Sequence, residues 1–242
     1  MKNLDFFYKD LEELSISLNE KQICQFMSYY ELLIEWNRVM NLTAITDFEE
    51  VCKKHFIDSL CFVKVFDDDT LQKKLSVIDI GTGAGFPGIP LKIVFPDLKI
   101  TLLDSLQKRV NFLETVIEKL SLENMEVIHG RAEDFAKKGK LREKYDICVS
   151  RAVANLSTLS EYCLPYIKNN GYFISYKSEK ISEEMEKAKN AIFILGGSIE
   201  KQIEFILPGS DIYRNLVVIR KIKETPALYP RKAGIPSKNP LI

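Results

Sequence analysis

The chain has 242 residues, of which 46% are hydrophobic and 28% are charged, a composition typical of a soluble globular protein. Its 34 Lys and Arg residues equal its 34 Asp and Glu residues, which excludes a strongly basic nucleic-acid binder but not a locally basic one. Residues 1–70 hold 7 basic and 14 acidic residues, a net charge of −7, so the remaining residues carry +7.

Cysteine usage and hydropathy indicate a cytoplasmic protein. The five cysteines are odd in number, widely spaced and without a CxxC pair, which favours reduced buried thiols over disulfides or a zinc site. The acidic N-terminus lacks the apolar core of a signal peptide. No apolar run approaches the roughly 18 residues that a membrane span requires, so we expect no membrane contact.

Residues 1–70 are predicted to form a helical N-terminal extension. Apolar residues recur there at three- and four-residue spacing, as on one face of a helix. Asn19 separates two such helices and is a candidate N-cap for the second. The segment 36–46 breaks the pattern and is predicted to be a loop, after which Thr46 or Asp47 caps a further helix. We expect Asp67-Asp68-Asp69 to end this helix, which places a boundary near residue 70.

Residues 71–224 are predicted to form an α/β domain with a doubly wound, mostly parallel Rossmann-like sheet. Five short β-branched runs alternate with helical patterns, and each connection is long enough for a crossover, at 75–80, 99–104, 125–130, 145–150 and 171–177. The clearest helices between them are 106–120 and 179–194. Two further runs, 203–207 and 216–222, flank a Pro-Gly turn and predict an antiparallel finish.

A glycine-rich turn follows the first predicted strand, in the sequence DIGTGAGFPG from Asp79 to Gly88. Glycines there permit positive φ and close approach of the backbone to a ligand, and the first turn of such a sheet is where cofactors bind. Asp79 is expected to point a carboxylate into the pocket, which would disfavour a pyrophosphate and favour the cationic S-adenosyl-L-methionine. Gly83 is a further candidate contact. Asp104 ends the second strand and suits a ribose diol, although it could instead cap the following helix.

Two later strand ends carry further candidate site residues. Ala132 and Glu133 follow the third strand, where their backbone could frame an adenine or simply form an acidic capped turn. Arg151 follows the fourth strand and could hold the cofactor carboxylate or a phosphate bidentately. The Asn/Asp-Pro-Pro-aromatic motif of exocyclic-amine methyltransferases is absent, so we expect an acceptor that is already nucleophilic, such as guanine N7, and assign no catalytic base.

The two histidines predict no metal site. His55 and Asp58 are three residues apart on a predicted helix, a spacing that more often indicates a cap or an ion pair, and His129 has no ligand partner at metal spacing. The tail 225–242 is basic, proline-rich and aromatic, a composition that can contact a phosphate backbone and stack on a base. We expect this tail to dock on the α/β domain.

Six motifs, found in order from about residue 35 to the C-terminus, resemble the bacterial small-subunit ribosomal RNA methyltransferase G family, also named glucose-inhibited division protein B. The motifs are WNRVMNLTAIT, HFIDSL, DIGTGAGFPGIPL, RAEDF, SRAVA and YPRKAGIPSKNPL. The resemblance implies a class I methyltransferase that uses S-adenosyl-L-methionine, releases S-adenosyl-L-homocysteine and methylates N7 of one guanine in the 530 loop of 16S rRNA.

The resemblance also assigns residues and partners. It places cofactor contacts on Gly81, Phe86, Ala132, Glu133 and Arg151. Together with the basic tail, it makes seven residues candidate RNA contacts: Asn37, Arg38, Asn41, Lys177, Arg231, Lys232 and Lys238. The implied partner is 16S rRNA or the small ribosomal subunit, and we expect a monomer.

Three alternatives remain open from the sequence. A methyltransferase acting on a small molecule or another RNA position would share every cofactor residue, but it would not explain the basic tail. A regulator that binds the cofactor without turnover and an NAD-dependent oxidoreductase are the other two. Methyl transfer to a mapped guanine separates all three from the favoured interpretation.

Overall fold

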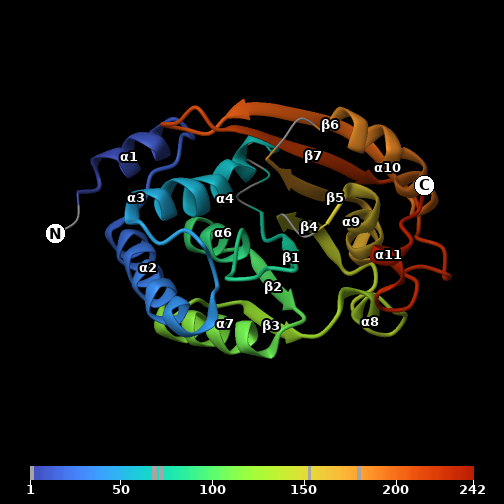
Figure 1. The fold of residues 1–242 in the computed structure, drawn as a ribbon, viewed down its shortest axis with the longest axis horizontal. Helices are drawn as coiled ribbons and strands as arrows, with labels where there is room; N and C mark the ends of the chain where they lie inside the picture. The colour runs from blue at the N-terminus through green and yellow to red at the C-terminus, as the bar shows by residue number, and fades with distance from the viewer. Residues whose placement is uncertain (1–2, 67–69, 71–72, 152–153, 179–180) are drawn as a thin grey trace.

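A seven-stranded sheet forms the centre of the protein, in the strand order β3-β2-β1-β4-β5-β7-β6 (Figure 1). The computed structural model describes residues 3–66, 70, 73–151, 154–178 and 181–242. The strands are β1 (Ser76–Ile80), β2 (Lys99–Asp104), β3 (Met125–His129), β4 (Tyr145–Arg151), β5 (Ile167–Lys177), β6 (Gly197–Ile206) and β7 (Tyr213–Lys221).

The sheet has the predicted doubly wound, mostly parallel topology. Strands β3, β2, β1, β4 and β5 are parallel, whereas β7 runs antiparallel to β5 and β6 antiparallel to β7. The chain winds outward from β1 to β3 and then returns to β4, which pairs with β1 on its other side. The crossovers therefore diverge at the carboxyl ends of β1 and β4, the place where ligands bind in open α/β sheets.

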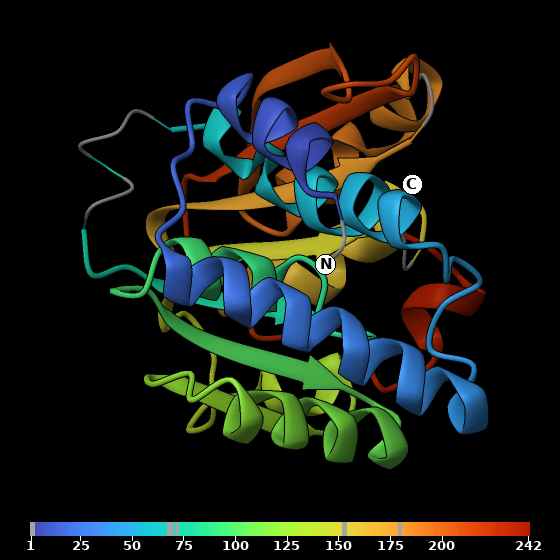
Figure 2. The same cartoon turned by 90° about the vertical axis from the view of Figure 1, so that its left-hand side faces the viewer.

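Helices cover both faces of the sheet (Figures 1 and 2). One face carries α1 (Asp5–Glu12), α2 (Glu20–Met40), α3 (Phe48–Val51), α4 (Asp58–Leu60), α6 (Gly88–Val94) and α7 (Gln107–Lys119), together with a π-helical turn (Cys52–Ile57) and a 3-10 turn (Cys61–Lys64). The other face carries α8 (Ala132–Phe135), α9 (Leu156–Cys163), α10 (Ser182–Ile194) and α11 (Ile235–Lys238), with a 3-10 turn (Leu164–Tyr166). No helix of the described ranges is long and apolar enough to cross a bilayer.

The N-terminal helices share one hydrophobic core with the sheet. Phe26 and Tyr29 of α2 and Phe56 of the π-helical turn are fully buried, and they belong to the same cluster as Val77 of β1 and Leu102 of β2. The ring centroids of Tyr29 and Phe56 lie 5.4 Å apart in a stacked arrangement. Because these aromatic side chains are buried against α6 and the sheet, residues 3–66 are packed as part of the same body.

The predicted helix ends are confirmed at two caps and wrong at one boundary. Asn19 caps α2 in a capping box with Gln22, and Asp47 caps α3. The predicted loop 36–46 is wrong over its first five residues, because α2 continues to Met40. Trp36 packs there against Phe112 of α7 at a centroid distance of 5.6 Å, and the helix ends where Asn41 adopts a left-handed φ of 49°.

The structure tests the prediction about the cysteines but not the one about the helix end at Asp67-Asp68-Asp69. Four cysteines are buried and Cys24 is exposed, and all five are free thiols. The expectation that Asp67-Asp68-Asp69 ends a helix falls outside the described residues.

The C-terminal tail docks on the α8–α11 face. Arg142 donates from its guanidinium to the backbone oxygens of Thr225, Pro226 and Tyr229. Arg231 forms a bidentate ion pair with Glu161 of α9, with Nη2 2.6 Å from Oε2 and Nε 2.9 Å from Oε1. The Glu161 side chain is only 1% exposed, so the ion pair fixes the tail near the C-terminal end of α9.

We predict that Arg231→Ala lowers the free energy of unfolding by about 3 kcal/mol, because Glu161 would remain as a buried charge without its partner. The adjacent Lys232 is exposed, so Lys232→Ala is the matched control and should change stability by less than about 0.5 kcal/mol. Urea denaturation of the two variants measures this difference. Equal, small losses would contradict the anchoring role of Arg231.

Candidate functional site

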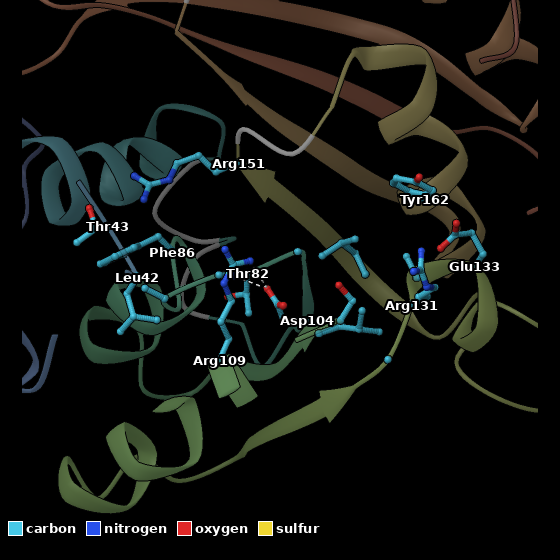
Figure 3. Close-up of a pocket in the computed structure, with 18 of the residues that line it drawn as sticks. Leu42, Thr43, Thr82, Phe86, Asp104, Arg109, Arg131, Glu133, Arg151 and Tyr162 are labelled. Atoms are coloured by element: carbon cyan, nitrogen blue, oxygen red, sulfur yellow. Dashed lines mark hydrogen bonds and ion pairs between the residues drawn. The ribbon is translucent and has the colours of Figure 1, made fainter. Parts of the chain in front are cut away.

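A cavity of about 530 Å³ lies at the carboxyl ends of β1, β2 and β4 (Figure 3). Leu42 and Thr43, which follow α2, line one end, and Glu133 and Tyr162 line the other. Most of its remaining lining comes from the turn after β1, the end of β2, the loop before α8 and the end of β4: Ile80, Gly81, Thr82, Gly83, Ala84, Phe86, Leu103, Asp104, Ser105, Arg109, Gly130, Arg131, Ala132 and Arg151. The cavity therefore occupies the predicted ligand-binding crevice.

The glycine-rich turn forms the floor of this cavity because its backbone packs closely against the sheet. A Cβ atom on Gly88 would lie 2.3 Å from Leu102 Cδ2 and 3.0 Å from Asp79 Oδ2, so a larger residue there would displace these side chains. Gly81 and Gly83 adopt φ values of +70° and +64°, which favour glycine. The hydroxyl of Tyr29 donates to the Ala84 carbonyl oxygen, so α2 holds the turn from the other side.

The expected orientation of Asp79 is wrong. Its side chain is fully buried and does not line the cavity; Oδ2 accepts from Thr82 Oγ1 at 2.7 Å and from the Gly88 amide at 2.9 Å. Burial raises the pKa of this carboxyl to about 6, although the bonds from Thr82 and Gly88 lower it. Asp79 thus holds the turn together. The argument from charge against a pyrophosphate required a carboxylate exposed to the cavity, and Asp79 does not provide one.

Asp104 lies at the end of β2 and lines the cavity, as expected. Its Oδ2 accepts from the Gly83 amide at 2.9 Å, and Oδ1 accepts from the Leu106 amide at 2.9 Å. Arg109 Nη1 lies 3.4 Å from Oδ2 (Figure 3). Asp104 is therefore compatible with both predicted roles, the helix cap and the ribose contact: it accepts from the backbone before α7, and its carboxylate lines the cavity. Oδ1 keeps a lone pair for a further donor.

Ala132 and Glu133 form the wall opposite Leu42. Both lie in the first turn of α8 and line the cavity, and both are buried. The Glu133 Oε1 atom accepts from the amide of Gly234 at 2.8 Å, so the docked tail fixes this wall from behind. Tyr162 of α9 lines the same end of the cavity.

Arg151 ends β4 and joins the sheet to the N-terminal helices. Its Nη1 lies 3.1 Å from Asp58 Oδ2, its Nη2 lies 3.2 Å from His55 Nδ1, and its guanidinium lies 4.9 Å from the centre of the Phe86 ring. The rings of His55 and Phe86 stack at 4.6 Å. The other Asp58 oxygen, Oδ1, accepts from Arg214 Nε at 2.8 Å.

The tautomer of His55 follows from its partners. Arginine has donors only, so Nδ1 accepts from Arg151, and Nε2 carries the hydrogen and donates to Thr43 Oγ1 at 2.8 Å. Burial, followed by the charge of Arg151, lowers the pKa of His55 to about 3. The imidazole is therefore neutral at pH 7 and both ring nitrogens are occupied. Asp58 pairs with the two arginines rather than with His55.

A second cavity of about 600 Å³ adjoins the first and shares His55 and Arg151 with it. Apolar and aromatic side chains form much of its lining, and four basic residues also line it: Lys54, Arg151, Lys177 and Arg214. The site therefore has two compartments on either side of one wall.

The seven candidate RNA contacts do not form one surface. Lys177 lines the second cavity and pairs with Glu184 at 2.7 Å. Arg231 differs from expectation, because its guanidinium is occupied by buried Glu161. Asn37 accepts from the Thr43 amide through Oδ1. The others are exposed: Arg38 and Asn41 near the end of α2, and Lys232 and Lys238 on the tail.

Thr43, His55, Arg109 and Tyr162 line the first cavity although the sequence did not single them out as cofactor contacts. Thr43 lies in the segment that resembles a family motif, and His55 lies in the motif HFIDSL, so the resemblance contained a signal for both. Arg109 lies within the predicted helix 106–120 and Tyr162 lies between two predicted strands, and neither carried such a signal.

Comparison with known proteins identifies close relatives. A family described as "rRNA small subunit methyltransferase G" matches residues 22–212. The chain is 53% identical over 242 residues to a protein of Lachnoclostridium phytofermentans named ribosomal RNA small subunit methyltransferase G, which covers all of this chain and 99% of that protein. It is also 53% identical over 231 residues to the protein of the same name from Clostridium novyi, with 96% and 94% covered.

Solved structures share the fold at lower identity. A SAM-dependent methyltransferase from Aquifex aeolicus matches with a TM-score of 0.53 and 21% identity, covering 73% of this chain and 94% of that one. The structure of M. jannaschii TYW2 in complex with AdoMet matches with a TM-score of 0.51 and 16% identity, covering 62% and 71%. These matches show a class I methyltransferase fold.

We predict that Asp79 makes stability depend on pH in the ligand-free protein. Its folded pKa of about 6 lies above the ordinary value of 3.8, so between these pH values the folded state retains a proton that the unfolded chain has lost. Raising the pH through this window therefore lowers the free energy of unfolding, by about 1.4 kcal/mol for each unit of pKa shift.

Asp79→Asn removes the titrating group while keeping its shape, and urea denaturation of both proteins at several pH values isolates its contribution. Relative to the variant, the wild type should lose stability as the pH rises from about 4 to about 6, and the difference should then stay constant. A difference that does not change with pH would contradict the buried, protonatable carboxyl.

Proposed function

The chain belongs to the rRNA small subunit methyltransferase G family, and we propose that it transfers the methyl group of S-adenosyl-L-methionine to N7 of a single guanine in the 530 loop of 16S rRNA. The observation that carries the proposal is the pair of adjoining cavities, one for the methyl donor and one beside it for the acceptor. Their shared wall, formed by His55 and Arg151, brings the two compartments within reach of each other.

The residues of the first cavity fit the cofactor. A volume of about 530 Å³ lies in the usual range of small-molecule sites. We assign the free lone pair of Asp104 Oδ1 to a ribose hydroxyl, and the wall at Ala132 and Glu133 to the adenine. Gly81, Gly83 and Phe86 supply the remaining contacts at the glycine turn, and Arg151 lies at the end where the cofactor carboxylate would be held. Asp79 acts indirectly, by holding the turn.

When bound, S-adenosyl-L-methionine supplies a methyl group on a sulfonium, a strong electrophile. Guanine N7 has a lone pair and loses no proton in the transfer, so the protein needs to position and desolvate the two reactants rather than to provide a base. The state of His55 agrees with this, because its ring is neutral and both nitrogens are occupied. We therefore assign no catalytic base.

Methyl mapping tests the proposal directly. Purified protein and methyl-labelled S-adenosyl-L-methionine are incubated with small ribosomal subunits from a strain that lacks this gene, and the label is then mapped on the rRNA. Label on N7 of one guanine in the 530 loop is the expected result. Label on another position or on a free nucleoside, or cofactor binding without transfer, would contradict the proposal.

We predict that Gly83→Ala weakens cofactor binding at least about 10-fold. Gly83 lines the cavity and the nearest atom to an added Cβ is 4.0 Å away, so the new methyl group would occupy space that the cofactor needs. Gly139 is the matched control, because it has a similar φ of +83° and open surroundings but does not line the cavity.

Both alanines adopt a left-handed conformation, so each variant should lose about 1 kcal/mol of stability. Isothermal titration with the cofactor and urea denaturation measure the two effects separately. If the affinity were unchanged in Gly83→Ala, or equally reduced in Gly139→Ala, the cofactor would not lie against the glycine turn.

A further inference from the structure

The second cavity has the size and lining of a pocket for a flat heterocycle. Its volume is about 600 Å³, and Tyr176, Phe205 and Leu216 provide apolar and aromatic surface. It opens beside the carboxyl ends of two neighbouring strands, because Arg151 of β4 pairs in register with Tyr176 of β5, which directly precedes Lys177. The inference below rests on the proposed function, which requires the acceptor base to lie next to the methyl donor.

Two carboxylates line this cavity among the described residues, and their hydrogen bonding differs. Both oxygens of Asp58 accept from arginines, Oδ2 from Arg151 and Oδ1 from Arg214. Glu184 of α10 uses only one oxygen: Oε1 accepts from Lys177 Nζ at 2.7 Å and from the Leu156 amide at 2.5 Å. Within the described part of the chain, Oε2 has no hydrogen-bond partner, and the side chain is 29% exposed.

Lys177 is also only partly engaged. Its ammonium group donates to Glu184 and to the Ala154 carbonyl oxygen at 3.0 Å, so among the residues that the structure describes one of its three hydrogens is uncommitted. The side chain is held in place, since only 11% of it is exposed. The adjacent pair thus presents one unused donor and one unused acceptor to the cavity.

We propose that the second cavity holds the target guanine, extruded from the RNA, with its Watson–Crick edge against Glu184 and Lys177. Guanine presents an acceptor, O6, next to two donors, N1–H and the N2 amino group, so Lys177 binds O6 and Glu184 Oε2 accepts from the donors. Adenine presents an amino group where guanine has O6, and an acceptor at N1, so both contacts would become repulsive. Reading an extruded base by this edge is common among enzymes that modify bases.

This orientation leaves N7 free to react. N7 lies on the other edge of the purine, so contacts to the Watson–Crick edge do not occupy its lone pair. The pair therefore acts as a specificity determinant, and Asp58 positions Arg151 and Arg214 around it.

The test compares guanosine with inosine at the target position, in small subunits reconstituted with ligated 16S rRNA. Inosine lacks the N2 amino group but keeps O6, N1–H and N7. Because a hydrogen bond to a charged group contributes about 1.5–3 kcal/mol, we expect the wild type to lose about 10-fold or more in kcat/KM on inosine. This comparison needs no variant, so it does not depend on the folding of a mutant.

Glu184→Gln is the corresponding variant, with Glu183→Gln as its matched control. A glutamine oxygen can keep the bonds to Lys177 and Leu156, which turns its amide nitrogen, a donor, toward the guanine amino group. We expect about 10-fold or lower kcat/KM on guanosine, a guanosine-to-inosine ratio below about threefold, and unchanged cofactor affinity. Glu183 is exposed on the same turn of α10, and its variant should behave as the wild type does.

The outcomes separate this inference from the proposed function. If the wild type methylates guanine N7 but treats inosine equally well, or if Glu184→Gln keeps the full guanosine-to-inosine ratio, the base-reading role of Glu184 is overturned and the proposed function stands. If the wild type methylates no guanine N7 at all, the proposed function itself fails. A loss of cofactor affinity in Glu184→Gln would also overturn the inference, since the residue would then act on the first cavity.

Discussion

One buried carboxylate connects the parts of the molecule that form both cavities. Asp58, from α4, lies between Arg151 at the end of β4 and Arg214 in β7, so it ties the N-terminal helices to the parallel and the antiparallel parts of the sheet. The three charged side chains are mostly buried, with 7–17% exposure. Because an unpartnered charge is costly in such surroundings, Asp58 holds Arg151 at the wall that the compartments share and Arg214 in the lining of the second cavity.

The acids around the site differ in function according to where the fold places their carboxylates. Asp79 is enclosed and holds the glycine turn, whereas Glu133 and Glu161 hold the tail. Asp104 and Glu184 each keep accepting capacity at a cavity. The same side-chain chemistry thus produces a buried anchor at Asp79 and cavity-lining carboxylates at Asp104 and Glu184, and the position of the side chain in the fold distinguishes them.

The tail shows how one segment can serve both purposes. Its composition indicated contact with RNA, but the structure divides its cations, since Arg231 faces inward to Glu161 while Lys232 and Lys238 are exposed. The amide of Gly234 also reaches Glu133, so the tail supports the cofactor cavity from behind. The tail therefore supports one wall of the first cavity from behind and exposes two of its lysines on the surface.

The sequence by itself determined the doubly wound, mostly parallel α/β sheet, the antiparallel strands at its end, the cap at Asn19 and the family, and it narrowed the cap of α3 to Thr46 or Asp47. These features depend on local patterns: alternation of strands with helices, turn residues, and motifs in which backbone conformation requires glycine. Only the tertiary structure decided that Trp36 extends α2 by packing on Phe112, that Asp79 faces inward, and that Arg231 is an anchor. The physical reason is that burial and charge pairing depend on the tertiary fold. Arg231, for example, pairs with Glu161, which is 70 residues away in the chain, and a local sequence pattern does not predict such a partner.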